Sequence, residues 1–514
     1  MKKSKIFNKY KWSAVAGDFN SPFIRNYIWT KGIYDYKRLF DVSRPVLGIV
    51  STENTIKYIG DLSEWAKSHE ELKKKTDEDN LFVEKLIDTT NSLGEDFNRW
   101  SEKNIFDNNL EKANNQSLVE LIGEFIQRQG DIYAYGTTLP ILDFMGFSFV
   151  EGNLKRILSE KLTESEYQKY FEVLTEPLHN SFAQDQEEDL LRLTNGFYSN
   201  DNWKKDTLNK PLNFLKEDYP DFYKKLEAHT KKYAWVYYVY AGPAYNENDF
   251  LGFIKDYLVK KVSPSDKLAE LKKKKGEIAR LRVQYIENLK PNDFERMILN
   301  LVGKMVWAKP RRKDYQSKSY YHLEKLMREI ARRLNISISQ ARSIPPEILL
   351  ESLNAGEIDT GLLNSIYKLH VCLPNDDGKV LVLSGKEAQE FSDVYVEKEK
   401  TEDLRNIKEI KGTAAYKGKA TGKVRVINLP TDMAKMQEGD ILVSTATTPS
   451  IVPAMKKAAA IVTDEGGLTC HASIVSRELG ITCLVGTKIA TKVFKDGDMV
   501  EVDADRGIVR LLNK

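Results

Sequence analysis

Residues 463–480 read TDEGGLTCHASIVSRELG and are the most informative stretch of the chain. The β-branched run before them predicts a strand that ends at residue 463, and residues 470–479 have the apolar spacing of a helix. Two consecutive glycines between these elements allow a tight turn with positive φ and exposed backbone N–H groups. The stretch therefore predicts a strand, a glycine turn and a helix that opens close to His471.

The predicted helix start gives His471 a distinct chemical setting. The first turn of a helix has free N–H donors and the positive end of the helix dipole, which favour an anion and disfavour an imidazolium. A neutral imidazole is a nucleophile, and the same helix end would stabilise a phosphoryl group added to it. These residues indicate a histidine that can be phosphorylated. A lone histidine at a helix start is more often a cap or a residue packed under a loop, so the wider sequence has to decide.

The wider sequence favours phosphorylation. Together with TTPSIVPAMKKAAAIVTD at 447–464, the motif closely resembles the mobile phosphohistidine domain of the phosphoenolpyruvate-utilising enzymes. That family includes phosphoenolpyruvate synthase, pyruvate phosphate dikinase and rifampicin phosphotransferase. In it, the histidine of the Gly-Gly-x-Thr-x-His pattern carries the phosphoryl group. The resemblance therefore makes His471 the phosphocarrier and the catalytic residue.

The resemblance also assigns the residues around His471. It implies a loop that frames the histidine and a supporting set beside it. The loop residues are Gly466, Gly467, Thr469 and Cys470, and the supporting residues are Thr448, Pro449, Arg477 and Glu478. The family usually has Pro where this chain has Thr482, a change expected to reduce turn rigidity and leave the chemistry intact.

The residues around the motif predict a compact C-terminal α/β module. Strand-like runs lie at 422–427, 440–444, 459–463, 482–486, 498–502 and 507–512, with helices expected at 449–457 and 470–479. The resemblance makes residues 412–514 a swivelling β/β/α phosphohistidine domain. Residues 393–411 are charged and carry few apolar side chains, so they are predicted to form an extended interdomain linker.

Residues 1–392 are predicted to form a mainly α-helical domain, which makes the protein multidomain. Two short strands are expected within 44–60, and helical spacing dominates after them. The expected helices cover about 63–75, 77–100, 117–145, 221–245, 265–289, 291–306, 317–334 and 345–353, with a further helix capped by Thr163. Through the stretches 231–243, 313–337 and 344–358, this domain more weakly resembles the helical region of rifampicin phosphotransferase and related stand-alone proteins. By analogy it would bind a phosphoryl acceptor or a partner.

Three weaker signals in the helical domain favour structural roles. A dense aromatic group around Gly242 can line a pocket for a ring-bearing acceptor, but the core of one helix is the favoured interpretation: Tyr233, Trp235, Tyr237, Tyr238, Tyr240 and Tyr245. The basic run Lys309–Lys313 can meet a phosphate, but a solvated loop is favoured. His322 and Glu329 lie two helical turns apart, and the intervening Lys325 would repel a cation, so no metal site is expected.

Composition limits the class of protein. The chain has 514 residues, with 78 Lys and Arg against 75 Asp and Glu, so its formal net charge is only +3. This balance argues against binding to nucleic acid or an anionic membrane through bulk charge. Three cysteines cannot form a disulfide framework, which predicts a cytoplasmic location. The N-terminus lacks the apolar run of a signal peptide, and no apolar stretch of about 18 residues predicts a membrane span.

The sequence therefore predicts a phosphotransferase component that acts in two steps through phospho-His471. By the resemblance, the donor is ATP or phosphoenolpyruvate with Mg²⁺, although no binding site for any of them is identified in this chain. No Gly-rich phosphate loop is found, and Gly412 to Lys419 has one residue too many for a Walker A motif. A separate ATP-grasp or donor-binding protein is expected, as in phenylphosphate synthase, which resembles this arrangement.

The acceptor, a small molecule or a protein, is not identified by the sequence. The alternative is a phosphocarrier or phospho-dependent interaction protein without acceptor chemistry of its own. A polar pocket facing His471 would favour the enzyme, and a flat protein-binding face would favour the carrier.

Overall fold

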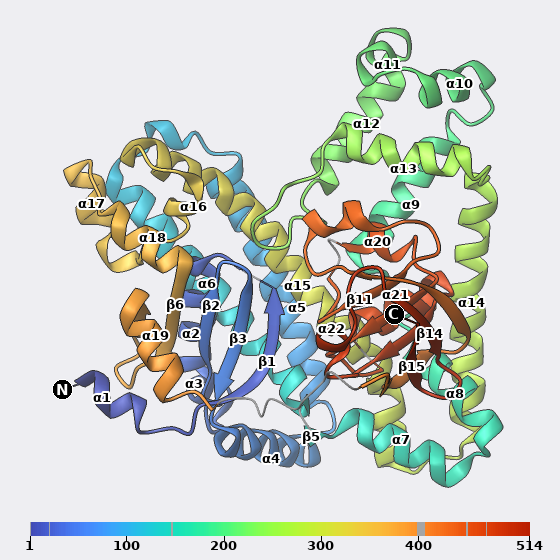
Figure 1. Ribbon diagram of the computed structural model, residues 1–514, viewed down its shortest axis with the longest axis horizontal. Coiled ribbons are helices and arrows are strands. Elements are labelled where there is room, and N and C mark those ends of the chain that lie inside the picture. Colours follow the sequence, from blue (N-terminus) through green and yellow to red (C-terminus); the bar gives the residue numbers. More distant parts are fainter. Residues whose placement is uncertain are drawn as a thin grey trace. The chain divides into compact units, whose positions relative to one another are not determined.

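The computed structural model describes residues 2–19, 21–144, 147–397, 407–448, 451–468 and 470–513. The chain divides into two compact units (Figure 1). Unit 1 comprises Met1–Asp79, Arg99–Phe147 and Leu323–Lys514, and unit 2 comprises Asn80–Asn98 and Ser148–His322.

The C-terminal part of unit 1 is an eight-stranded sheet with short helices, shown in orange and red in Figure 1. Its order is β8-β15-β14-β10-β11-β12-β13-β9, in which β10 to β13 run parallel and the other pairs are antiparallel. The strands are β8 (Glu409–Lys411), β9 (Thr413–Tyr416), β10 (Lys419–Val426), β11 (Ile441–Ser444), β12 (Ala460–Thr463), β13 (Thr482–Val485), β14 (Met499–Asp503) and β15 (Ile508–Asn513). The short helices are the 3-10 turn Pro430–Lys435, α20 (Val452–Met455), α21 (His471–Leu479) and α22 (Ala490–Val493).

All six strands predicted in this module are confirmed. Each contains β-branched and other apolar residues that the sheet buries, as Val424, Val462 and Leu484 show with no exposed surface. The two strands that the sequence did not predict, β8 and β9, have three and four residues and lie at the edges of the sheet. Such short, partly polar segments carry no clear periodicity.

The N-terminal part of unit 1 contains a second, fully antiparallel sheet in the order β1-β3-β2-β6-β7. Its strands are β1 (Ser13–Phe19), β2 (Gly48–Thr52), β3 (Thr55–Gly60), β6 (Leu369–Pro374) and β7 (Val380–Ser384). The predicted strand pair within 44–60 is β2 and β3. The other three strands were not predicted. β2 pairs with β6 across more than 300 residues of chain, and no local pattern reveals such a pairing, whereas β6 and β7 form a local hairpin that the sequence analysis did not detect.

Helices complete unit 1. They are α1 (Lys2–Phe7), α2 (Phe23–Tyr34), α3 (Tyr36–Phe40), α4 (Leu62–Glu78), α6 (Asn115–Leu142), α16 (Ile338–Ala341), α17 (Leu349–Ala355), α18 (Thr360–Lys368) and α19 (Gly385–Val394), with single turns at Glu102–Phe106, Leu110–Lys112 and Pro346–Ile348. Two-residue strands β4 (Asp143–Phe144) and β5 (Phe147–Ser148) follow α6. The predicted mainly helical N-terminal region is thus confirmed.

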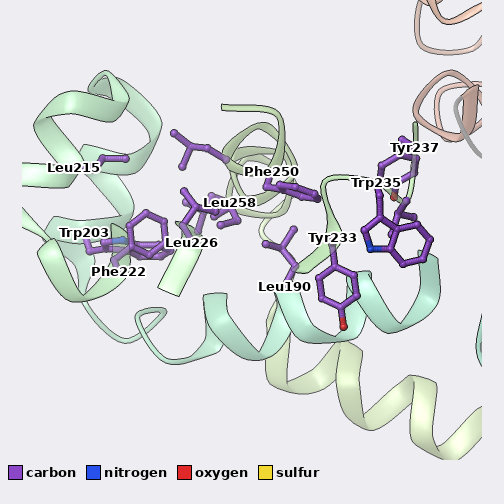
Figure 2. Close-up of a cluster of buried hydrophobic side chains, with 13 residues drawn as sticks. Leu190, Trp203, Leu215, Phe222, Leu226, Tyr233, Trp235, Tyr237, Phe250 and Leu258 are labelled. Atoms are coloured by element: carbon purple, nitrogen blue, oxygen red, sulfur yellow. The ribbon is translucent and has the colours of Figure 1, made fainter. Parts of the chain in front are cut away.

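Unit 2 consists of helices: α7 (Val150–Lys161), α8 (Glu164–Thr175), α9 (Phe182–Asn195), α10 (Asp201–Asn209), α11 (Leu212–Asp218), α12 (Pro220–Tyr233), α13 (Glu247–Val259) and α14 (Pro264–Asn288), together with parts of α5 (Phe82–Ser101) and α15 (Asp293–Leu334). Thr163 and Glu166 form the predicted capping box of α8. Trp203, Phe222 and Phe250, which have no exposed surface, lie in the apolar core among α9 to α13 (Figure 2). This burial stabilises the unit by removing large aromatic surfaces from water.

One long helix replaces two predicted ones. α15 runs without a break for 42 residues and contains Pro310, where the sequence predicted a solvated loop. A proline inside a helix removes one backbone hydrogen bond and predicts a break. Here the residues after it are packed: the Arg311 guanidinium lies 3.5 Å from the centre of the Phe182 ring, and Tyr315 is 1% exposed. The loop interpretation of Lys309–Lys313 is therefore wrong, because tertiary packing keeps this segment helical.

The aromatic group is a core feature, but it does not belong to one helix. α12 ends at Tyr233, and the residues that follow form turns. Trp235 and Tyr237 are nonetheless buried in the core shown in Figure 2. The predicted core role is confirmed for these residues, and the single-helix geometry is corrected.

The predicted linker overlaps ordered elements at both ends. Val394 is the last residue of α19, Val396 forms a β-bridge with Trp12, and β8 begins at Glu409. Residues 398–406 lie outside the described residues. The domain boundaries at 392 and 412 stay predictions.

Candidate active site

His471 is the first residue of α21 and is half-buried. The chain reaches it from β12, a completely buried strand, through residues 464–470. Thr447, which follows the neighbouring strand β11 and is 6% exposed, places its hydroxyl oxygen 2.7 Å from His471 Nδ1. Because β11 and β12 are adjacent and parallel, the loops after their carboxyl ends meet, and this brings Thr447 to the histidine.

The glycine turn before His471 needs glycine at Gly466. Its φ is +108°, and a Cβ there would lie 2.6 Å from Cys470 Sγ. Both the backbone conformation and the close approach of Cys470 therefore exclude a larger residue. Cys470 is the N-cap of α21 and is half-buried, with its sulfur 3.4 Å from the Ser473 hydroxyl.

Carbonyl groups of the loop are held by side chains of α21. The Ser473 hydroxyl donates to the Gly467 carbonyl over 2.8 Å, and Arg477 Nη2 donates to the Leu468 carbonyl over 3.0 Å. Arg477 is only 6% exposed. These bonds tie the loop to the helix that carries His471, so loop and histidine form one local structure.

Asp464 anchors the start of the loop on its other side. Its carboxylate accepts hydrogen bonds from the Thr491 backbone N–H at 3.1 Å, the Thr487 hydroxyl at 3.3 Å and the Thr491 hydroxyl. Burial raises the pKa of Asp464, and these hydrogen bonds oppose the rise. The carboxylate thus fixes the turn between β12 and the glycines against the residues that begin α22.

The predicted site residues fall into three groups. Gly466, Gly467, Cys470 and Arg477 lie in or against the loop, as described above. Thr448 directly follows the contact residue Thr447, and Glu478 is a half-buried residue of α21. Thr469 and Pro449 lie outside the described residues.

Thr448 and Pro449 were predicted beside the site from the stretch Thr-Thr-Pro at 447–449, but Thr447 itself was given no role, and Asp464 and Ser473 were missed. A signal was present for Thr447, which begins the quoted stretch TTPSIVPAMKKAAAIVTD. A signal was also present for Asp464, because it is a carboxylate that directly follows a buried strand. Ser473 had none, because its hydroxyl bond depends on the folded loop.

The weaker candidate His322–Glu329 does not form a site. Burial lowers the pKa of His322 to about 3, and Glu329 accepts hydrogen bonds from Arg332 at 2.7 Å and Arg333 at 2.6 Å. Across the part of the chain that is described, no three His, Cys, Asp or Glu side chains gather as metal ligands would. None of the described helices combines the length and apolar character needed to cross a membrane.

Comparison with known proteins identifies the module that carries His471. Residues 436–507 match the family "PEP-utilising enzyme, mobile domain". A probable phosphoenolpyruvate synthase of Archaeoglobus fulgidus is 45% identical over 181 residues, which are 32% of this chain and 23% of that protein. Phosphoenolpyruvate synthase of Pyrococcus furiosus is 50% identical over 136 residues, 26% of this chain and 16% of that protein.

A relative with a different name shares the same module. Chondramide synthase of Chondromyces crocatus is 48% identical over 105 residues, which are 20% of this chain and 3% of that protein. The chain thus spans less than a quarter of the length of each of these three relatives.

Proposed function

We propose, from the membership of residues 436–507 in the mobile-domain family of PEP-utilising enzymes, that this chain is a phosphotransferase component that carries a phosphoryl group on His471. The observation that supports it most directly is the position of His471 at the start of α21 with Nδ1 held by Thr447. Because the hydroxyl engages Nδ1, phosphorylation is expected at Nε2.

The chemistry is two successive displacements at phosphorus. In the first, His471 Nε2 attacks the donor phosphorus, the N–P bond forms and the bond to the donor oxygen breaks. In the second, an acceptor oxygen attacks, the N–P bond breaks and the imidazole is released. The N–H groups at the start of α21 stabilise the charge that the phosphoryl group brings.

The donor is ATP or phosphoenolpyruvate, bound by a separate ATP-grasp or other donor-binding protein in the cytoplasm. Mg²⁺ would neutralise the phosphate charge of the donor. The carboxylate nearest to the loop in sequence, Asp464, is already bonded to Thr487 and Thr491. We therefore place no Mg²⁺ ligand beside His471 and derive no step through the ion.

The acceptor is a small molecule or a protein. The alternative, a phosphocarrier without acceptor chemistry of its own, is supported by the recurrence of the module in chondramide synthase. A module found in such different proteins does not by itself specify an acceptor.

Phosphate labelling tests the proposal. Fractions of a cell extract, with ³²P-labelled ATP or phosphoenolpyruvate, are incubated with the wild type, with His471→Ala and with His179→Ala as the matched control. Label should appear on the wild type and the control, be acid-labile and alkali-stable, and be absent from His471→Ala. Undiminished label on His471→Ala would overturn the proposal. Loss of the label on adding a candidate acceptor identifies an enzyme, and transfer only to a protein favours the carrier.

A further inference from the structure

The connection that follows β10 reaches the edge of the sheet at which His471 lies. Strands β10, β11 and β12 are parallel neighbours, so their carboxyl ends lie side by side, and each is followed by a loop. The loops after β11 and β12 carry Thr447 and His471. The connection after β10 carries Asn428, a half-buried residue. In open α/β sheets the loops at this edge are the ones that contact ligands, so Asn428 is placed to act on the site.

The side chain of Asn428 binds the end of β11. Its Oδ1 accepts the backbone N–H of Thr445 at 2.9 Å and lies 3.1 Å from the Ser444 hydroxyl. A backbone N–H can only donate, so the amide atom that faces Thr445 is the oxygen. The contact therefore requires an acceptor at this position, and a side chain without one would leave the Thr445 N–H unsatisfied.

The backbone of Asn428 is itself held in place. Oδ2 of Asp432, in the 3-10 turn Pro430–Lys435, accepts the backbone N–H of Asn428 at 3.1 Å and that of Leu429 at 2.9 Å. Oδ1 of Asp432 forms an ion pair with Lys435 at 2.9 Å. The chain from which the Asn428 side chain extends is thus fixed, and the position of its oxygen is fixed with it.

Thr445 links the two loops that meet at His471. Its N–H is held by Asn428, and its carbonyl accepts the N–H of Glu465 at 2.8 Å, in the loop that leads to His471. Two residues after Thr445, the Thr447 hydroxyl reaches Nδ1 of His471 at 2.7 Å. The orientation of the peptide groups at Thr445 thus determines where Thr447 lies relative to the imidazole.

We propose that Asn428 is a positioning residue for the phosphorylation of His471 and acts through Thr447. This role rests on the function proposed above. For Nε2 to attack, the neutral imidazole keeps its hydrogen on Nδ1, and Nδ1 donates it to the Thr447 hydroxyl oxygen. Because Asn428 holds the end of β11, it keeps this oxygen within reach of Nδ1 and so favours the reactive tautomer.

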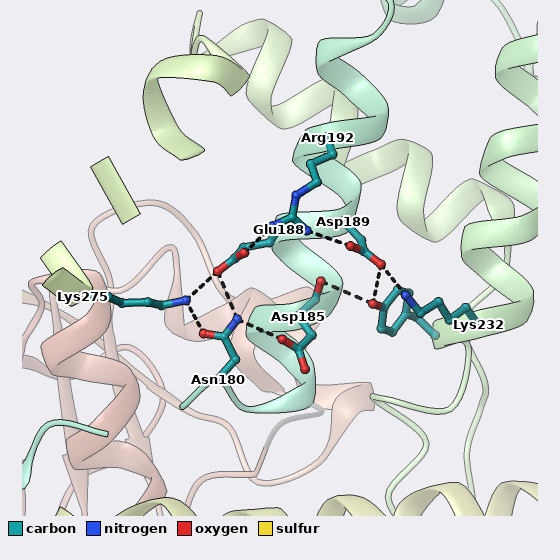
Figure 3. Close-up of polar contacts among 8 residues, drawn as sticks. Asn180, Asp185, Glu188, Asp189, Arg192, Lys232 and Lys275 are labelled. Atoms are coloured by element: carbon teal, nitrogen blue, oxygen red, sulfur yellow. Dashed lines mark hydrogen bonds and ion pairs between the residues drawn. The ribbon is translucent and has the colours of Figure 1, made fainter. Parts of the chain in front are cut away.

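A second asparagine provides a matched control. Asn180 in unit 2 is also half-buried, and its side chain belongs to the polar network in Figure 3. Its Nδ2 donates to Asp185 at 2.9 Å and to Glu188 at 3.0 Å, and its Oδ1 accepts from Lys275. All of these partners belong to unit 2. Asn180→Ala therefore removes side-chain hydrogen bonds of an asparagine outside the module that carries His471.

Nitrogen NMR of the unphosphorylated full chain, labelled with ¹⁵N-histidine, tests the positioning without a donor. The ring signals of His471 are assigned by their loss in His471→Ala. We expect protonated Nδ1 in the wild type and, in Asn428→Ala, a shift of the signals toward those of the Nε2-protonated tautomer. Asn428→Asp keeps an acceptor oxygen and should retain the wild-type signals, as should Asn180→Ala.

Asn428→Gln covers the case in which Asn428→Ala folds poorly. It keeps the amide but displaces its oxygen by one methylene, so it should shift the His471 signals in the same direction. Ring signals of His471 that match the wild type in both Asn428→Ala and Asn428→Gln would overturn the proposal.

A double-mutant cycle tests whether Asn428 acts through Thr447. Initial rates of acid-labile labelling are compared for Asn428→Ala, for Thr447→Val and for the two changes combined. Each single change should slow labelling about fivefold, and the combination should label about as slowly as Thr447→Val alone. Slowing by the product of the two factors, about 25-fold, would contradict action through Thr447. If the wild type acquires no label from any fraction, the proposed function fails, and the NMR result still decides whether Asn428 positions the ring.

Discussion

In the reaction proposed above, the hydroxyl of Thr447 engages Nδ1 of His471 and leaves Nε2 available to the phosphorus. Thr447→Val keeps the shape of the side chain and removes the 2.7 Å contact to Nδ1. A hydrogen bond of this kind is worth about 1 kcal/mol, so the initial rate of His471 labelling should fall about fivefold. Thr447→Ser keeps the hydroxyl and should label nearly as fast as the wild type. The assay follows acid-labile phosphate with time, and wild-type rates in the valine variant would remove Thr447 from the mechanism.

Asp314 makes stability depend on pH in a defined direction. Its pKa is about 7 in the folded chain against an ordinary value of 3.8, so the folded state binds its proton more tightly than the unfolded state. The resulting stabilisation is complete below about pH 3.8 and is lost as pH rises through about 7. The wild type should therefore lose stability between pH 5 and pH 8, and Asp314→Asn should not. The free energy of unfolding of Asp314→Asn, relative to that of the wild type, should rise over this range by an amount on the order of a few kcal/mol. Guanidinium titrations at both pH values measure this gain, and a constant difference would contradict it.

At the scale of elements, the loop between β12 and α21 depends on its glycine turn. Gly466→Ala introduces a Cβ that would lie 2.6 Å from Cys470 Sγ at a φ of +108°. We expect a loss of about 1–3 kcal/mol in stability, measured by denaturant titration, together with a large loss of His471 labelling, because the loop must shift. Gly439→Ala is the matched control, with a φ of +86° and no atom within 4 Å of the new Cβ. Gly439→Ala should lower stability without lowering His471 labelling. Equal labelling of the two variants would show that the loop tolerates the shift.

The helices and strands also show how much of the fold could be predicted from the sequence. The six C-terminal strands were predicted because each contains a short run of β-branched and other apolar residues with turn residues at its ends. The continuity of α15 was missed because Pro310 is locally unfavourable in a helix, and only the packing of Arg311 and Tyr315 reveals why it is tolerated. Strands β1 and β6 pair with β3 and β2, which are distant in the chain, and β7 was missed together with its hairpin partner β6.

The candidate site likewise contains residues that the sequence identifies and contacts that it does not. His471 and Gly466 were identified from a contiguous motif, which records local geometry directly. The Thr447–His471 contact joins residues 24 positions apart, and the Asp464–Thr491 bond joins residues 27 apart. Both depend on which strands are neighbours in the sheet, and that information is not local.

At the scale of the whole molecule, the chain aligns with a probable phosphoenolpyruvate synthase over 181 residues at 45% identity, and this region spans 23% of that protein's length. Phosphorylation from ATP or phosphoenolpyruvate requires a cradle for the donor phosphates and ligands for Mg²⁺. The 514-residue sequence contains no Gly-rich phosphate loop that satisfies the Walker A spacing. We therefore expect the donor-binding step to be performed by another protein.

That expectation gives the last prediction. The purified chain, incubated with Mg²⁺ and either ³²P-labelled donor, should acquire no acid-labile phosphate, because the imidazole of His471 meets no bound donor. Adding a separate ATP-grasp protein or a donor-binding fraction from the same cell should restore labelling at up to one phosphate per chain, and His471→Ala should stay unlabelled under the same conditions. Stoichiometric, His471-dependent labelling of the isolated chain would mean that its helical region binds the donor.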